Sequence, residues 1–291
     1  LPQWFVSLRQ SISVSFTAFL TIQFLGVFAL FFVPTFCYGA AFPLIARGVS
    51  NLNNIGEEVG RVYWWNTIGT VAGVILTGFL FIPFLGIKLS MVLLQSLTAL
   101  CALILLKNSS LEKRYFTAAS VTVLLVIVSC SSISTWDKRV LTSGVFRYWD
   151  SVKESVAARE KNSELLYYSE TRSGVVSVQR YGKKLSLKVN GKPDASSGSD
   201  MVTQLLLAHI PLALAEKREN VLVIGVGSGV TAGACLPFED VKSVDAIELL
   251  PTVTEASKLF KEQNGSYWLD KRVTVYEEDG RNFVAFINKK Y

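Results

Sequence analysis

The sequence is poor in the residues that bind metals or form disulfides. It has one histidine, His209, and four cysteines in 291 residues. No two cysteines follow the C-x-x-C spacing of common metal and redox motifs. Most of the cysteines lie in apolar segments, where cysteine packs as a small hydrophobic residue. We therefore expect no metal site, no disulfide and no serine–histidine–acid triad, and we expect His209 to be a packing residue.

Concentrated positive charge is also absent. The net charge is +6, but no basic run with interleaved aromatic residues occurs, so a nucleic acid is not an expected partner. The long apolar stretches of the first half carry no charge near their centres. Ionisable groups at such positions usually mark the path of an ion or charged solute. These stretches are therefore not expected to form a complete pump on their own.

Long apolar stretches dominate the first half of the chain. About 20 apolar residues cross a bilayer as a helix. Four stretches reach or approach this length, at residues 12–46, 63–85, 89–106 and 116–133. Pro34 and Pro43 interrupt the first stretch and predict a kinked helix, with room for a short second piece. The sequence thus predicts an α-helical transmembrane bundle over residues 1–135.

The second apolar stretch has a distinctive beginning, "RVYWWNTIGTVAGVILTGF". Trp64 and Trp65 stand where aromatic residues of a membrane interface are expected. Gly69 and Gly73 are four residues apart, a spacing that favours close helix packing. Asn66 is expected to form an interhelical hydrogen bond, and a contact with a transported substrate is the alternative.

The pattern changes after residue 135. The runs "GVVSVQRY" and "KLSLKVN" predict two strands joined by a turn at Gly182 and Lys183. The segment "SGSDMVTQLLLAHIPLALAEK" predicts a helix, with Ser199 or Asp200 as its N-cap. We interpret residues 136–198 as a linker and a small β-strand domain.

Residues 199–291 alternate between strands and helices. "NVLVIGV", "SVDAIEL" and "RVTVYEED" predict three strands, each followed by a helical segment. This alternation is typical of an α/β Rossmann-like domain with a parallel sheet. Ligands of such sheets bind at the carboxyl ends of the strands.

Glycines and acids follow the three predicted strands, where a ligand is expected. A turn, "GVGSG", follows the first strand, an acid ends the second, and an Asp-Gly pair ends the third. The turn lacks the Lys-Ser/Thr of a phosphate-binding loop. One acid can accept hydrogen bonds from ribose hydroxyls and the other from an adenine amino group. This pattern predicts an adenosyl site without a pyrophosphate, with NAD as a lesser alternative. The candidate residues are Gly225, Gly227, Ser228, Gly229, Glu248, Asp279 and Gly280.

Several of these segments resemble the spermidine synthase family of aminopropyltransferases, whose fold is of the class I methyltransferase type. "VLVIGVGSGVTAGA", "VDAIEL", "RVTVYEEDGRNF" and "SDMVTQLLLAHIPL" carry the resemblance, and "SGVVSVQRYGKKLSLKVNGK" is similar to the family's N-terminal strand domain. "FPLIARG" and "GRVYWWNTIGTVAG" resemble the membrane-fused members found in bacteria.

The resemblance implies a role in polyamine biosynthesis. The donor would be decarboxylated S-adenosylmethionine, approached by the three glycines of the turn. Glu248 would hold the ribose, and Asp279 and Gly280 would meet the adenine. An aminopropyl group would pass to a small-molecule amine, and S-adenosylmethionine itself is the alternative donor.

The chain departs from the family where the amine would bind. Thr203, Gln204 and Leu205 stand where family members carry a tyrosine and an acid, and Asp194 replaces a glutamine. The family's catalytic aspartate lies on a fourth strand, which we expect beyond Tyr291. We therefore expect a domain truncated at its C-terminus, in a chain that is a fragment at both ends, and we assign no catalytic residue.

Two other functions stay open at this point. One is a methyltransferase that uses S-adenosylmethionine, and the other is a transporter or sensor that binds a nucleoside or polyamine without chemistry. The expected partners are the lipid bilayer, the amine and a second copy of the chain. We expect an integral protein of the bacterial inner membrane. Its soluble domain is placed in the cytoplasm, where S-adenosyl donors are made, although the distribution of Lys and Arg leans the other way.

Overall fold

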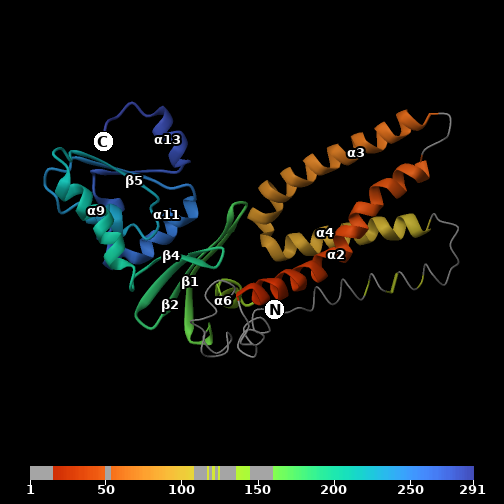
Figure 1. The fold of residues 1–291 in the computed structure, drawn as a ribbon, viewed down its shortest axis with the longest axis horizontal. Coiled ribbons are helices and arrows are strands. Elements are labelled where there is room, and N and C mark those ends of the chain that lie inside the picture. Colours follow the sequence, from red (N-terminus) through yellow and green to blue (C-terminus); the bar gives the residue numbers. More distant parts are fainter. Residues whose placement is uncertain are drawn as a thin grey trace. The chain divides into compact units, whose positions relative to one another are not determined.

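The computed structural model describes residues 16–49, 54–107, 136–144 and 160–291, together with residues 117, 120, 121 and 124. Contacts within the chain divide it into two compact units (Figure 1). The first unit comprises residues 7–127, and the second comprises residues 128–291 with residues 1–6. The domain boundaries expected from the sequence, at residues 135 and 198, stay predictions.

The first unit begins with one long helix. Helix α2, Phe16–Val49, is continuous and contains both Pro34 and Pro43, so the first apolar stretch forms no separate second piece. Within the described residues, two stretches are long and apolar enough to cross a membrane, Leu20–Gly48 and Ile55–Leu105. Both meet this criterion by length and composition only.

A break divides the second of these stretches. Helix α3, Ile55–Leu76, runs through a π-helical turn, Thr77–Phe81, into helix α4, Ile82–Lys107. Gly86 interrupts α4 with φ 76° and ψ 171°, a backbone conformation outside the helical region. The break lies between the predicted stretches 63–85 and 89–106. Figure 1 shows the chain reversing direction between α3 and the main part of α4.

The small residues of α3 do not pack against another helix in the described part of the chain. A Cβ atom added at Gly69 or Gly73 of α3, or at Gly78 of the π-helical turn, would meet no neighbouring atom within 4 Å. The predicted close helix approach is therefore not made here, and this face of α3 is open. Most of the fourth apolar stretch, residues 116–133, lies outside the described residues.

The second unit contains an antiparallel sheet in the order β1-β2-β3-β4. Its strands are β1, Ser163–Thr171; β2, Gly174–Tyr181; β3, Lys184–Val189; and β4, Lys192–Ser196. The two predicted strands correspond to β2 and β3, and their turn is at Gly182 and Lys183 as expected. Strand β4 was not predicted, because its sequence, KPDAS, is rich in residues that strands usually avoid.

A buried polar cluster ties this sheet to the short helix α6, Lys138–Leu141. Lys188 is only 2% exposed, and its Nζ donates to Gln179 Oε1 at 2.5 Å and to Tyr181 Oη at 2.9 Å. Gln179 Nε2 donates to Glu160 Oε2 and to the backbone oxygen of Arg139, both at 3.2 Å. The lysine charge is thus buried with hydrogen-bond partners, as burial requires.

The rest of the second unit is an α/β domain with a parallel sheet in the order β5-β6-β7. Its elements in chain order are α9, Met201–Leu214; β5, Asn220–Ile224; α10, Val230–Ala234; β6, Ser243–Ile247; α11, Pro251–Ser257; η3, Lys258–Phe260; α12, Lys261–Asn264; η4, Tyr267–Leu269; β7, Val273–Tyr276; and α13, Gly280–Phe286. The predicted Rossmann-like alternation is therefore present.

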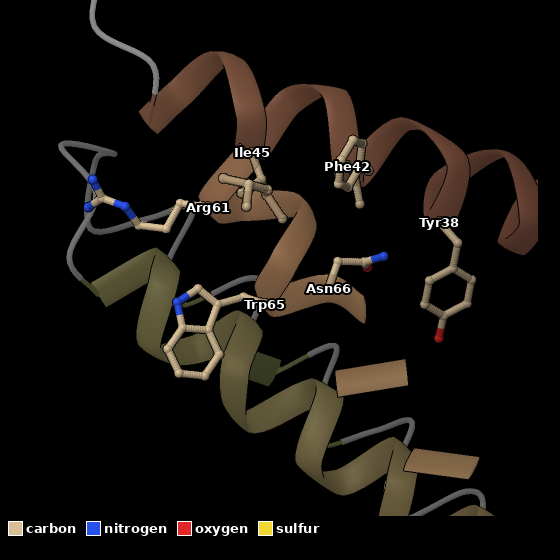
Figure 2. A pocket seen from close by; sticks show the side chains of 8 residues that line it. Tyr38, Phe42, Ile45, Arg61, Trp65 and Asn66 are labelled. Atoms are coloured by element: carbon tan, nitrogen blue, oxygen red, sulfur yellow. The ribbon is translucent and has the colours of Figure 1, made fainter. Parts of the chain in front are cut away.

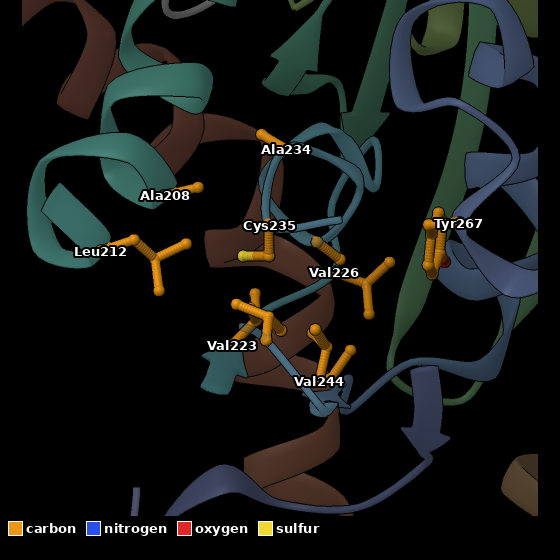
Figure 3. Close-up of a cluster of buried hydrophobic side chains, with 11 residues drawn as sticks. Ala208, Leu212, Val223, Val226, Ala234, Cys235, Val244 and Tyr267 are labelled. Atoms are coloured by element: carbon orange, nitrogen blue, oxygen red, sulfur yellow. The ribbon is translucent and has the colours of Figure 1, made fainter. Parts of the chain in front are cut away.

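Two apolar clusters hold the second unit together. The first lies around β5, β6 and α9 and includes Leu212, Val223, Val244 and Tyr267 (Figure 3). The second joins the antiparallel sheet to α11 and η3, since Val176, Val178 and Leu187 pack in one cluster with Val253, Ala256 and Phe260. The small sheet is thereby fixed against the helix that follows Glu248.

Candidate functional site

The predicted site residues gather at one edge of the parallel sheet. Ile224 pairs with Ile247, and Ile247 pairs with Tyr276, so β5, β6 and β7 end level with one another. The glycine turn, Glu248 and the segment leading to Asp279 all leave from this edge. This is the carboxyl edge, where parallel sheets bind their ligands.

Glycine is required in the turn for conformational and steric reasons. Gly225, Gly227 and Gly229 have φ values of 90°, 54° and 78°, which residues with a Cβ rarely adopt. Gly229 is also the N-cap residue of α10. A Cβ atom at Gly229 would lie 2.2 Å from Cε1 of the fully buried Tyr267. The chain can therefore pass this point only without a side chain.

Ser228 points into the protein. It is 1% exposed, and its hydroxyl donates to Oε1 of Gln204 on α9. Its backbone oxygen accepts a hydrogen bond of 2.8 Å from Asn264 Nδ2. The hydroxyl and the backbone oxygen of Ser228 thus both hold the turn in place within the protein.

Two residues that support the turn were not predicted in that role. Gln204 contacts the turn through Ser228, and Asn264 is buried with both sides of its amide hydrogen-bonded. The sequence signal at Asn264 was the Asn-Gly pair formed with Gly265, which is typical of a helix end. That signal indicates the local turn but not the distant partner.

Glu248 joins the turn to the start of α11. Its Oε2 accepts hydrogen bonds from the backbone N–H of Val226 at 3.0 Å and of Gly227 at 3.4 Å. Its Oε1 accepts from the backbone N–H of Leu250 at 3.1 Å. A carboxylate has about four acceptor positions, so this half-buried side chain retains capacity for a ligand hydroxyl.

Asp279 caps the helix that follows it. Its Oδ1 accepts from the backbone N–H groups of Arg281 at 2.8 Å and Asn282 at 3.2 Å. Asp279 is thus the N-cap residue of α13, and this role leaves its Oδ2 available. Gly280 lies against Ile224, because an added Cβ would be 2.8 Å from Ile224 Cγ2. The start of α13 therefore lies against the end of β5 at the site.

The positions that depart from the family pattern have varied surroundings. Thr203 is exposed, whereas Leu205 packs against the apolar cluster of the parallel sheet. Asp194 is exposed and pairs with Lys192 at 2.5 Å. None of these three contributes a carboxylate or hydroxyl that contacts the glycine turn in the described structure.

Two further predictions concern α9. Asp200 is the N-cap residue by position, but its carboxylate accepts from Ser196 rather than from the helix amides. The His209 ring packs edge-on against Phe238, with the ring centroids 5.7 Å apart. This contact agrees with a packing role for His209.

Among the described residues, no group of three or more His, Cys, Asp or Glu side chains could hold a metal ion. Cys235 is buried, and burial raises the pKa of its thiol to about 11. The thiol is therefore protonated at neutral pH and is a poor nucleophile or metal ligand.

Comparisons with known proteins show which sequences and structures this chain resembles. Residues 200–291 match the family model described as the Spermine/spermidine synthase domain. Polyamine aminopropyltransferase 2 of Aquifex aeolicus (strain VF5) is 25% identical over 100% of this chain and 57% of its own length. Polyamine aminopropyltransferase of Oceanobacillus iheyensis is 24% identical over 87% of this chain and 48% of its own length.

The chain therefore spans about half the length of these two curated relatives. Among solved structures, spermidine synthase from Thermotoga maritima is similar over 41% of this chain and 42% of its own, with 21% identity and a TM-score of 0.39. Residues 200–291 are thus similar to the spermine/spermidine synthase domain, and the chain as a whole resembles curated polyamine aminopropyltransferases.

Proposed function

We propose that this chain is part of a membrane-anchored aminopropyltransferase that uses decarboxylated S-adenosylmethionine. One observation carries the proposal: the Glu248 carboxylate is held against the glycine turn, at the same sheet edge as Asp279. In the proposal, the remaining acceptor capacity of Glu248 receives a ribose hydroxyl. Oδ2 of Asp279 receives the adenine amino group while Oδ1 continues to cap α13.

The proposed reaction is a displacement at carbon. The nitrogen of an amine attacks the aminopropyl carbon bonded to the sulfonium sulfur. The carbon–sulfur bond breaks, its electron pair goes to sulfur, and methylthioadenosine leaves. The new ammonium then loses a proton. The turn and Glu248 contribute by fixing the donor so that the sulfonium carbon is presented in one orientation.

The curated relatives support this reaction class, since both are named polyamine aminopropyltransferases. The identity of the amine that accepts the aminopropyl group is less constrained than that of the donor. Leu205, one of the three positions that stand where the family carries a tyrosine and an acid, packs against the apolar cluster of the parallel sheet and presents no charge. This observation favours a second candidate, methyl transfer from S-adenosylmethionine, because only the amine half of the site would differ.

Membrane anchoring is the other part of the proposal. Large apolar side chains on α2, α3 and α4 are widely exposed, including Phe36, Val74 and Leu105. Trp64 and Trp65 form an edge-on pair at the start of the apolar part of α3, where interfacial aromatic residues are expected. We place the second unit on the cytoplasmic side of the membrane.

Calorimetric titration of the purified full chain tests the donor site. Decarboxylated S-adenosylmethionine, methylthioadenosine, S-adenosylmethionine and NAD would be compared on the wild type and Glu248→Gln. We expect the decarboxylated donor and methylthioadenosine to bind best. Loss of the carboxylate should weaken both about tenfold or more, since hydrogen bonds to charged groups contribute about 1.5–3 kcal/mol.

The matched control is Glu239→Gln, which removes the same charge from the exposed loop before β6, at the opposite edge of the sheet. It should leave binding unchanged. Preference for S-adenosylmethionine would replace aminopropyl transfer with methyl transfer. Binding of none of the four compounds by folded protein would contradict the adenosyl site.

A further inference from the structure

A cavity of about 510 Å³ lies between α2 and α3 in the first unit, and none of its lining residues belongs to the site described above. Its lining residues are Tyr38, Ala41, Phe42, Ile45, Arg61, Val62, Trp65 and Asn66. The two helices contact each other beside it, since the rings of Phe42 and Tyr63 meet edge-on with centroids 6.1 Å apart. Its volume is in the range of sites that hold small molecules.

The polar part of the lining consists of hydrogen-bond donors. Tyr38, Arg61, Trp65 and Asn66 can all donate, and Arg61 carries a positive charge. None of the described residues that line the cavity is an acid. Figure 2 shows Arg61 and Tyr38 toward opposite ends, with Phe42, Ile45 and Asn66 between them. A lining of this kind suits an anion.

Arg61 is not saturated by its neighbours. Glu57 and Glu58 approach only its Nη2, each at 3.5 Å, and the Arg61 side chain is 55% exposed. A guanidinium has five N–H donors, and a phosphate would accept two of them in parallel. The carboxylates therefore leave a phosphate-binding edge of Arg61 open.

The remaining lining is apolar. Ala41, Phe42, Ile45 and Val62 form a hydrocarbon surface that a free inorganic anion could not use. Only residues 50–54 separate α2 from α3, so Ile45 and Arg61 lie near the same end of the helix pair. Arg61 is about 9 Å along α3, at 1.5 Å per residue, just before the apolar part that begins with Tyr63.

We propose that this cavity binds an anionic glycerophospholipid, with its phosphate on Arg61 and its hydrocarbon against Phe42, Ile45 and Val62. Asn66 donates to an ester oxygen deeper in the cavity. The inference rests on the membrane anchoring of the proposed function. Trp64 and Trp65 stand at the level where phosphate groups and aromatic side chains meet in a bilayer.

Native mass spectrometry of the full chain in detergent tests the proposal. Dioleoyl-phosphatidylglycerol would be titrated against the wild type, Arg61→Gln and Arg47→Gln. We expect Arg61→Gln to weaken binding about tenfold, the effect of one charge-assisted contact. Arg47 is the matched control, because it is an exposed arginine at the same helix end that does not line the cavity. Its loss should change binding by less than about threefold.

Two results would overturn the proposal. Equal losses of lipid affinity in Arg61→Gln and Arg47→Gln would show that the lipid is attracted to positive charge in general. Displacement of the lipid by inorganic phosphate at matched concentration would show an anion site without lipid character. Arg61→Lys separates folding from recognition, since it keeps the charge and should recover part of the affinity.

Failure of this inference is distinguishable from failure of the proposed function. Donor binding would be measured by calorimetry on the same protein preparations. Retention in membranes would be measured by fractionating the cells from which those preparations are made. If donor binding and retention persist while Arg61→Gln binds lipid normally, only the lipid site is contradicted. If the chain is not retained in membranes, both the anchor and the lipid site are contradicted.

Discussion

Gly229 is the position where the turn is least tolerant of a side chain. We expect Gly229→Ala to destabilise the second unit by about 2–4 kcal/mol. Part of this is the left-handed backbone, at about 1–2 kcal/mol, and the rest is the overlap with Tyr267. Thermal unfolding of the purified protein measures the loss.

Gly182→Ala is the control for that prediction. Gly182 also has a positive φ, 60°, but an added Cβ there would meet nothing within 4 Å. It should show only the backbone cost, about 1 kcal/mol. Equal losses at the two positions would mean that Tyr267 does not restrict the turn.

Single residues also show where sequence reasoning succeeds and where it ends. The glycines, Glu248 and Asp279 could be predicted to share one edge because each follows a strand of a parallel sheet. The support given by Gln204 and Asn264 could not, because it joins residues 24 and 36 positions apart in the chain. Such contacts depend on the packing of whole elements.

At the scale of elements, Phe260 of η3 joins the antiparallel sheet to α11. It is fully buried in the cluster formed by β2, β3, β4 and α11. Phe260→Ala should destabilise the second unit by about 3–5 kcal/mol, as expected for a large buried ring. The neighbouring Leu259 is 38% exposed, and Leu259→Ala should cost less than about 1 kcal/mol. Equal shifts of the unfolding midpoint in Phe260→Ala and Leu259→Ala would contradict this packing role of Phe260.

The beginning of β7 is fixed by an ion pair. Asp270 accepts from the Arg272 guanidinium at 2.9 and 3.1 Å, and Arg272 also donates to the backbone oxygen of Leu236 at 2.9 Å. The hydrogen bonds from Arg272 lower the pKa of Asp270 to about 2. A lowered pKa gives stability that is complete above the unfolded value, near 3.9, and is lost as the pH falls through 2.

We therefore expect Asp270→Asn to lower the unfolding midpoint at neutral pH. The difference from the wild type should shrink as the pH falls from about 4 to about 2. Thermal unfolding across this range measures the difference. Glu262→Gln, at an exposed acid of α12, should show no such trend. A difference between Asp270→Asn and the wild type that is constant with pH would exclude the ion pair as its source.

Elements were predicted best where their pattern is regular. The alternation of β2 and β3 and the three apolar strands of the parallel sheet were clear from sequence. Strand β4 was missed because pairing with β3, rather than its own composition, makes it a strand. The helical segment predicted after the third strand is the short helix α13, which ends at Phe286.

At the scale of the whole molecule, the two units expose different surfaces. Because α2, α3 and α4 present large apolar side chains, we expect the chain to remain in the membrane fraction after an alkaline carbonate wash. Immunoblotting of pellet and supernatant measures this. Release into the supernatant would contradict membrane anchoring.

The general organisation of the chain could be predicted from sequence, because apolar length and strand–helix alternation are properties of long segments. The open face of Gly69 and Gly73 shows the limit. A small-residue spacing indicates that a close partner is tolerated, but it does not identify the partner or show that this chain supplies it.

The support of the glycine turn by Asn264 also sets an order of events during synthesis. Asn264 is made 36 residues after Ser228, to whose backbone oxygen it donates. At about 5–20 residues per second, a ribosome needs roughly 2–7 s to cover that distance. Throughout that interval the nascent turn lacks one of its supports, so the turn reaches its final form only after the chain has been extended through α12.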